Sequence, residues 1–253
     1  MTGKQEVWDD VWKSYEIDIN DYSKRLFKIL KSAKMEPVKN YVTSKETGTV
    51  KIVECGCGSG KLTLSMAKVF GTEAHLFDIS KEAVKMAMKN SNGLDTKSNI
   101  FLASITDTPY KNDAFDITMS FGVNEHFEGN DRQKILDEMI RITKMDGMII
   151  VLVPNKMCFP YVFGMGVRKI LGKWRFGLEI PYSKNEIKRL AKKTGVKIEH
   201  MESNRFLSSF VWLMVRRIGI FNFLFHKFKR MPFPLLDNIF GQLIIVILRK
   251  QIN

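Results

Sequence analysis

Cysteine and long apolar runs are both scarce in this chain. Its 253 residues include three cysteines, at positions 55, 57 and 158, which are too few for a disulfide framework. Cys55 and Cys57 have neither the spacing nor the second ligand pair of a zinc site. No stretch reaches the roughly 20 apolar residues of a membrane-spanning helix, and the first residues lack the apolar core of a signal peptide. The sequence therefore predicts a reduced, cytoplasmic protein without a metal centre.

Acidic residues are also under-represented. The chain has 27 Asp and Glu against 40 Lys and Arg, which gives a net charge of +13 and a pI near 9.6. Such an excess favours an anionic partner, which is a nucleic acid, an anionic membrane surface or an acidic small molecule. Two stretches, 156–178 and 205–230, contain no acidic residue at all. The hydrophobic content of 45% is that of a folded protein, and the length suits one domain.

The most informative stretch begins with an apolar run at Val50 and continues through glycines at positions 56, 58 and 60 into a helical pattern. Glycine permits a positive φ and leaves no Cβ between the loop and a ligand. The unpaired N–H groups of the helix that follows attract an electron-rich or carboxylate-bearing ligand. A dinucleotide-binding loop would need its third glycine at position 61, where the chain has Lys61. The spacing therefore argues against NAD.

Short apolar runs alternate with helical patterns after this loop, which predicts a doubly wound α/β sheet. Further strands are expected at 73–77, 99–103, 115–120 and 147–154, and helices at 62–70, 81–90 and 131–143. Beyond these, the pattern predicts a helix at 184–194 with a Ser183 and Glu186 capping box, and strands at 195–200 and 241–250. Pro37 and the polar residues 43–48 are expected to form a connection.

Candidate site residues follow the ends of the predicted strands, where ligands bind in open α/β sheets. Asp78 ends the second strand, where a carboxylate can accept hydrogen bonds from both ribose hydroxyls, and Ile79 would lie against an adenine ring. The fourth strand leads into Phe121, Glu125 and His126. His126 and Glu125 are rival candidates for a general base, although a packed histidine would explain the pattern as well.

Glu54-x-Gly56-x-Gly58-x-Gly60 resembles the first motif of the class I S-adenosylmethionine (SAM)-dependent methyltransferases, and Pro109 and Phe115-Asp116 stand at that family's intervals. Residues 177–195 resemble the type 11 branch. The resemblance implies a Rossmann-like, seven-stranded, mostly parallel sheet whose last strand is antiparallel. It also implies SAM as cofactor, bound by Glu54, Gly56, Cys57, Gly58, Gly60, Asp78, Ile79, Ser104, Ile105 and Phe121.

The flanking segments suggest additions to a single domain that covers residues 1–253. Amphipathic residues 6–33 either pack on the core or form, within 1–40, a helical lid whose aromatic residues close over the SAM pocket. Residues 45–155 would be the SAM-binding core and 237–253 the last strand. Between them, 156–236 would form an inserted cap in which the basic, aromatic stretch 205–230 either contacts an anionic membrane or packs on the sheet.

Three hypotheses about function remain open at this point. The first is methyl transfer from SAM to an apolar small molecule, lipid-like and reached from the inner membrane face, with a sugar or glycolipid O-methyltransferase as a close variant. The second is an RNA or DNA methyltransferase, which the positive charge favours. Against a nucleic-acid substrate, residues 121–124 are not the Asn/Asp-Pro-Pro-aromatic loop associated with amino-group methylation of flipped bases, and no RNA-binding module is evident. The third is a SAM-binding or membrane-binding protein without catalysis.

Overall fold

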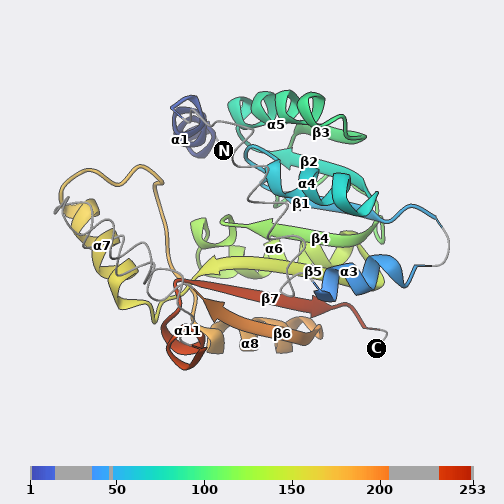
Figure 1. Cartoon of the computed structure of the whole chain (residues 1–253). Helices are drawn as coiled ribbons and strands as arrows, with labels where there is room; N and C mark the ends of the chain where they lie inside the picture. The colour runs from blue at the N-terminus through green and yellow to red at the C-terminus, as the bar shows by residue number, and fades with distance from the viewer. Residues whose placement is uncertain (1, 15–35, 46–47, 205–233, 252–253) are drawn as a thin grey trace.

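The computed structural model of the chain describes residues 2–14, 36–45, 48–204 and 234–251 (Figure 1). The helices are α1 (Thr2–Lys13), α3 (Glu36–Thr43), α4 (Lys61–Phe70), α5 (Lys81–Leu94), α6 (Asn130–Ile142), α7 (Phe159–Ile170), α8 (Lys184–Thr194) and α11 (Pro234–Phe240), with a short 3-10 helix, η2 (Asn124–His126). The strands are β1 (Lys51–Cys55), β2 (Glu73–Asp78), β3 (Ser98–Leu102), β4 (Phe115–Phe121), β5 (Thr143–Pro154), β6 (Lys197–Asn204) and β7 (Leu243–Arg249).

Within the described residues, the strands form one seven-stranded sheet in the order β3-β2-β1-β4-β5-β7-β6. Strands β1 to β5 pair in parallel, whereas β7 runs antiparallel to both of its neighbours, β5 and β6. This arrangement confirms the predicted Rossmann-like sheet with an antiparallel last strand. The strand order reverses direction between β1 and β4, and open α/β sheets bind ligands at such a switch point.

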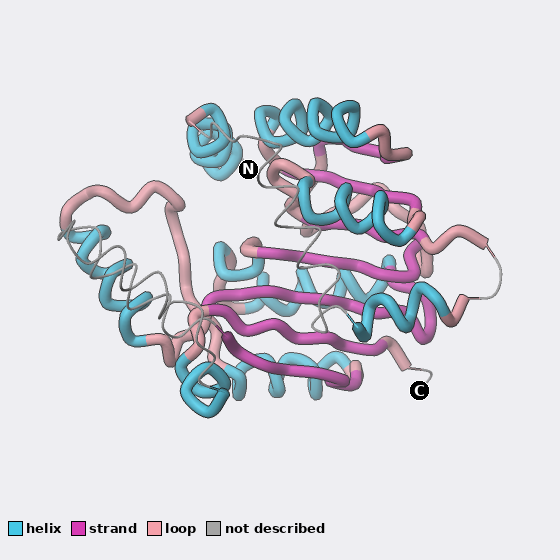
Figure 2. The backbone as a smooth tube through the Cα atoms, viewed as in Figure 1, coloured by secondary structure: helices cyan, strands magenta, loops and turns pink. Residues whose placement is uncertain are grey.

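Helices cover both faces of the sheet, which gives three layers (Figures 1 and 2). On one face, side chains of α3, α4 and α5 pack against Ile52, Leu76 and Ile117. On the other face, side chains of α6 and α8 pack against Val53, Phe77 and other strand residues. The central strands are therefore apolar on both sides, as parallel strands covered by helices usually are.

Local signals set several helix ends where the sequence predicts them. Gly71 caps α4 in the left-handed region, with φ of 67°, a conformation that glycine adopts without a Cβ clash. Ser183 begins α8, and its hydroxyl accepts a hydrogen bond from the Glu186 N–H. The side chain of Glu186 pairs with Arg132 of α6, so the helix start is joined to its neighbour.

Other boundaries differ from the prediction. Helix α5 continues past residue 90 to Leu94 and ends at Asp95, whose backbone is left-handed (φ 50°), so Gly93 lies inside the helix. Residues 36–43 form α3, where a connection was expected, because Pro37 occupies the first turn and Val38 and Tyr41 are buried against the sheet. Strand β5 begins four residues earlier than predicted and β6 extends four residues further.

Two helices lie on the side of the sheet where the carboxyl ends of the parallel strands are (Figure 1). Helix α1 lies beside α5, and α7 projects from the end of β5. The lid over residues 1–40 and the cap over 156–236 stay predictions, because most of residues 6–33 and all of 205–230 fall outside the described residues. In the part of the chain that the structure describes, no helix is long and apolar enough to cross a membrane.

Candidate functional site

The glycine loop folds back on the end of β2. The N–H groups of Gly56 and Cys57 both donate to the Phe77 carbonyl, at 2.9 Å each. Gly56, Gly58 and Gly60 all have positive φ, at 73°, 52° and 67°. A Cβ added at Gly56 would lie 2.5 Å from a methyl group of Val123, and one added at Gly58 would lie 2.3 Å from the Trp12 ring. Glycine is thus required at both positions by backbone conformation and by space.

Asp78 lies directly against this loop. Its Oδ2 accepts a hydrogen bond from the Gly58 N–H at 2.8 Å, and its Oδ1 accepts one from the Ser80 N–H at 2.9 Å. Burial raises the pKa of the carboxyl, while these two N–H groups oppose the rise. Gly58 of the loop and Asp78, the residue predicted to bind the ribose, therefore form one surface, although they are 20 residues apart in sequence.

Glu54 is buried and points toward the start of α4, where its Oε2 accepts a hydrogen bond from the Thr63 hydroxyl. Burial raises the pKa of Glu54 to about 8, with the hydrogen bond from Thr63 opposing and the charge of Asp78 adding to the rise. Asn90 of α5 donates to the Ser59 carbonyl at 2.7 Å. Glu54 and Asn90 thus brace the two sides of the loop.

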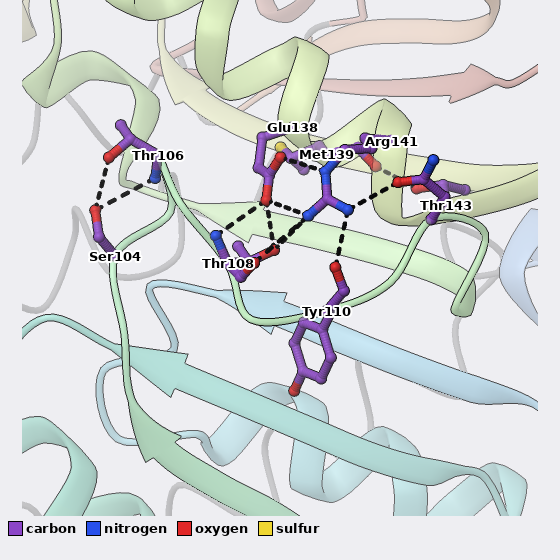
Figure 3. Close-up of polar contacts among 9 residues, drawn as sticks. Ser104, Thr106, Thr108, Tyr110, Glu138, Met139, Arg141 and Thr143 are labelled. Carbon is purple, nitrogen blue, oxygen red and sulfur yellow. Dashed lines mark hydrogen bonds and ion pairs between the residues drawn. The ribbon is translucent and has the colours of Figure 1, made fainter.

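Ile79, Ser104 and Ile105 follow β2 and β3 and extend the surface away from the loop. Ile105 is buried, and Ile79 and Ser104 are half-buried. The Ser104 hydroxyl lies 2.8 Å from that of Thr106 and accepts a hydrogen bond from the Thr106 N–H (Figure 3). The predicted adenine wall is therefore part of an ordered turn.

A half-buried ion pair on α6 holds the remainder of this turn (Figure 3). Glu138 accepts hydrogen bonds from the N–H and hydroxyl of Thr108, and Arg141 donates to the Tyr110 carbonyl at 2.8 Å. The Arg141 guanidinium, 2.7 Å from Glu138, lowers the pKa of that carboxyl to about 2. No sequence signal marked Glu138 or Arg141, because their partners lie about 30 residues away.

The exit of β4 brings the two candidate bases to the same side. Phe121 is half-buried at the strand end, and Glu125 and His126 lie in η2, both nearly fully buried. The Nδ1 of His126 lies 2.6 Å from the Leu178 carbonyl; since a carbonyl only accepts, Nδ1 carries the proton and Nε2 of the neutral ring is an acceptor.

Glu125 has a buried oxygen, Oε2, for which the structure gives no hydrogen-bond partner. Burial raises the pKa of Glu125 to about 8, and the neighbouring charge of Glu179 adds to the rise. Glu179 is itself buried and accepts a hydrogen bond from the Tyr161 hydroxyl of α7. A poorly solvated carboxyl with an unused oxygen is suited to accept a proton from a bound ligand.

Helix α1 packs over the same area. Trp12 lies on Gly58, and the Trp8 ring meets the His126 ring edge-on at 4.7 Å between centroids. Asp9 is hydrogen-bonded to the Ser80 hydroxyl at 2.5 Å and accepts a bond from the Glu82 N–H at 3.3 Å. The carboxylate thereby caps the positive end of α5. The sequence had indicated the two tryptophans as lid residues but gave no reason to single out Asp9.

The sequence and the fold both resemble those of known methyltransferases. The sequence profile of the methyltransferase domain family matches residues 53–151. The match includes the glycine loop and Asp78, and it agrees with the resemblance to the type 11 methyltransferases in the sequence. Ajmaline N-methyltransferase of Rauvolfia serpentina is 32% identical to the chain over 103 residues, which are 40% of this chain and 35% of that enzyme. Tocopherol O-methyltransferase of Arabidopsis thaliana is 29% identical over 104 residues, 40% of this chain and 29% of that enzyme.

The fold around the methyltransferase domain is shared more widely than the sequence. Geranyl diphosphate C-methyltransferase from Streptomyces coelicolor, solved with Mg²⁺, geranyl diphosphate and S-adenosyl-L-homocysteine, aligns with a TM-score of 0.61 over 98% of both chains, at 13% identity. That identity shows the fold alone. The alignments to the two curated relatives span only about a third of each.

Proposed function

We propose that this protein is a SAM-dependent methyltransferase that acts on a small-molecule acceptor. The proposal depends on the hydrogen bond between Gly58 and Asp78, which joins the glycine loop to the carboxylate that is predicted to bind the ribose. The methyltransferase domain match over residues 53–151 supports the same cofactor. When bound, SAM supplies a methyl group that its positive sulfonium already activates.

The residues present fit that cofactor. Gly56 and Gly58 let Val123 and Trp12 approach the loop backbone more closely than a Cβ would allow, and the carboxylate of Asp78 lies beside the loop. We infer that the loop holds the methionine end, that Asp78 holds the ribose, and that Ile79, Ser104 and Ile105 surround the adenine.

What remains for this chain is to align the acceptor, to exclude water and to remove a proton. Trp8 and Trp12 of α1 cover the loop and His126 and are suited to exclude water. Glu125, with its unused buried oxygen, is our first candidate for the base, and His126, through Nε2, is the second.

For the acceptor we propose an apolar, lipid-like molecule reached at an anionic membrane surface. The support is that α7 and the segment after it carry exposed apolar and basic side chains. The backbone of Leu178 and Ile180 in that segment contacts His126 and Glu125. The tocopherol and geranyl diphosphate enzymes that resemble this chain carry the names of isoprenoid compounds. A glycolipid acceptor would fit the same features, and the net charge keeps RNA as a rival.

Calorimetry with SAM, followed by transfer of labelled methyl from SAM into a total lipid extract, a polar metabolite extract and total RNA, tests the proposal. The wild-type protein should bind SAM and label the lipid fraction. Asp78→Asn, which replaces one acceptor oxygen by a donor, should weaken SAM binding about tenfold or more, whereas Asp137→Ala, an exposed acid of α6, should not. Absence of SAM binding by the wild-type protein would refute the proposal, and label in RNA alone would refute the acceptor class.

A further inference from the structure

Exposed apolar side chains gather on one part of the described structure. Of its thirteen large exposed hydrophobic residues, seven lie within residues 157–178, namely Met157, Phe159, Phe163, Val167, Ile170, Leu171 and Leu178. Ile170 and Phe159 are 87% and 68% exposed, so most of each residue's surface is in contact with solvent. A contiguous patch of this kind marks an interaction surface.

The helix α7 arranges these side chains as a stripe. Phe159, Phe163, Val167 and Ile170 are spaced by four, four and three residues, which places them on one helical face. The rings of Phe159 and Phe163 stack at 5.7 Å between centroids. We refer to this stripe, with Leu171, as the α7 face.

The opposite side of α7 is anchored, so the stripe has a defined orientation. Gly164 and Met165 are buried, and the Tyr161 hydroxyl donates to the carboxylate of Glu179. Lys169 adds a hydrogen bond to the Glu179 carbonyl at 3.2 Å. Because these contacts hold the inner side, the α7 face points outward, and Figure 1 shows the helix projecting from the end of the sheet.

The charged residues of the segment that carries the α7 face have one sign. Lys156, Lys173 and Arg175 are exposed in this segment, and no acidic residue occurs from 156 to 178. Basic side chains next to exposed aromatic and aliphatic ones match an anionic bilayer, where phosphates lie above the acyl chains. A protein partner would more commonly offer mixed charges at the rim of its interface.

We propose that the α7 face docks on an anionic lipid membrane. The inference rests on the proposed function, because the segment that follows α7 leads directly to the acceptor end of the site. The Leu178 carbonyl contacts His126, the Ile180 N–H donates to the Glu125 carbonyl at 2.9 Å, and the Phe176 ring lies 6.3 Å from that of Trp8 of the lid. Docking would therefore bring the bilayer next to the residues that receive an apolar acceptor.

Vesicle flotation tests the proposal with the full-length protein. The wild type should float with phosphatidylcholine vesicles that contain about 30% phosphatidylglycerol, should bind pure phosphatidylcholine much less, and should be released by salt. The double variant Phe163→Ser/Ile170→Ser should bind the anionic vesicles at least about tenfold more weakly, since two apolar side chains no longer enter the bilayer.

A matched control is available on the same molecule. Met88→Ser/Leu102→Ser removes two exposed apolar side chains from α5 and β3, away from α7, and should leave vesicle binding unchanged. Lys156→Gln/Lys173→Gln should weaken binding to anionic vesicles about tenfold and flatten its salt dependence. Circular dichroism and SAM calorimetry on each variant establish that it is folded.

Three results would overturn the proposal. The first is that the wild type binds neither kind of vesicle, and the second is that the α7 variants bind as the wild type does. The third is a wild-type dimer in sedimentation that the Phe163→Ser/Ile170→Ser variant converts to monomer, because a second copy of the chain would then occupy the α7 face. Methylation of an acceptor supplied in detergent reads the proposed function separately. If that reaction proceeds while vesicle binding fails, docking alone is refuted.

Discussion

At the scale of single residues, the carboxyl of Glu125 is unusual because it is buried in the short helix η2. A carboxyl buried with an oxygen that has no hydrogen-bond partner in the structure is costly unless it is protonated or used. Burial raises its pKa to about 8, Glu179 adds to the rise and Arg132 opposes it. Glu125 is therefore mostly protonated at neutral pH, and it becomes a base as the pH rises.

We expect kcat/KM to increase with pH with a midpoint near 8 and to level off above it, because only the ionised form of Glu125 accepts a proton. Glu125→Gln should lower kcat about 100-fold and remove this limb of the profile. The measurement is a pH–rate profile of labelled methyl transfer for both proteins. A limb that persists in the variant would assign the base to another group, of which His126 is the second candidate.

At the scale of elements, loops after the strands owe their shape to helices from elsewhere in the chain. The turn that carries Ser104 and Ile105 is held by Glu138 and Arg141 of α6, through Thr108 and Tyr110 (Figure 3). These hydrogen bonds involve charged groups and are partly buried, so each contributes more than a bond on the open surface.

Arg141→Met should lower the free energy of unfolding by about 1–2 kcal/mol and weaken SAM binding several-fold, because the adenine wall loses its support. Thermal denaturation and calorimetry measure the two effects. Arg189→Met, which replaces an exposed arginine of α8, serves as the control. Equal SAM affinity in both variants would show that the hydrogen bonds of Arg141 do not support cofactor binding.

Helix α1 offers a second test at this scale, since adjacent acids have different partners. Asp9 caps α5 through Ser80 and Glu82, and its pKa is lowered, with these hydrogen bonds outweighing desolvation. Asp10 forms only a distant ion pair with Lys13, at 3.7 Å, and is 79% exposed. If α1 is a lid, Asp9→Ala should speed dissociation of S-adenosyl-L-homocysteine about three- to tenfold.

Stopped-flow displacement measures this rate, with Asp10→Ala as the matched control. The same rate in Asp9→Ala, Asp10→Ala and wild type would show that α1 does not retain the cofactor product.

At the scale of the whole molecule, buried acids link stability to pH. Glu54 and Glu125 both have a pKa raised to about 8 by burial, from 4.5, and that of Asp78 is raised as well. Between about pH 4.5 and pH 8 the folded chain therefore holds more protons at these groups than the unfolded chain does. Their contribution to the free energy of unfolding must fall as the pH rises through that window.

We expect the melting temperature of the protein without SAM to decrease from pH 5.5 to about pH 8. Glu54→Gln, which stays neutral and keeps an oxygen to accept from Thr63, should make this decrease smaller. Differential scanning calorimetry across the window measures the slope. An equal slope in Glu54→Gln and wild type would contradict the role of Glu54.

Sequence alone was sufficient for the fold and for the glycine loop. Strand and helix periodicities are local, and they predicted the order of elements from β1 to β5 and the helices α4, α6 and α8. The glycines at 56, 58 and 60 were equally readable, because a positive φ favours one residue type wherever it occurs. The approximate length of α5 was misjudged, since packing carried the helix through Gly93, and α3 was missed because burial of Val38 and Tyr41 outweighed a weak local signal.

Only the tertiary structure decided which groups support the site. Asp9 contacts the start of α5, Arg141 contacts the turn after β3, and Leu178 contacts His126. The residues in each of these contacts are about 30 to 70 positions apart in the sequence. Such contacts depend on where whole elements pack, and side-chain patterns with periods of two or 3.6 residues carry no record of that. The sequence determined what each segment would become, and the packing of segments determined which side chains meet.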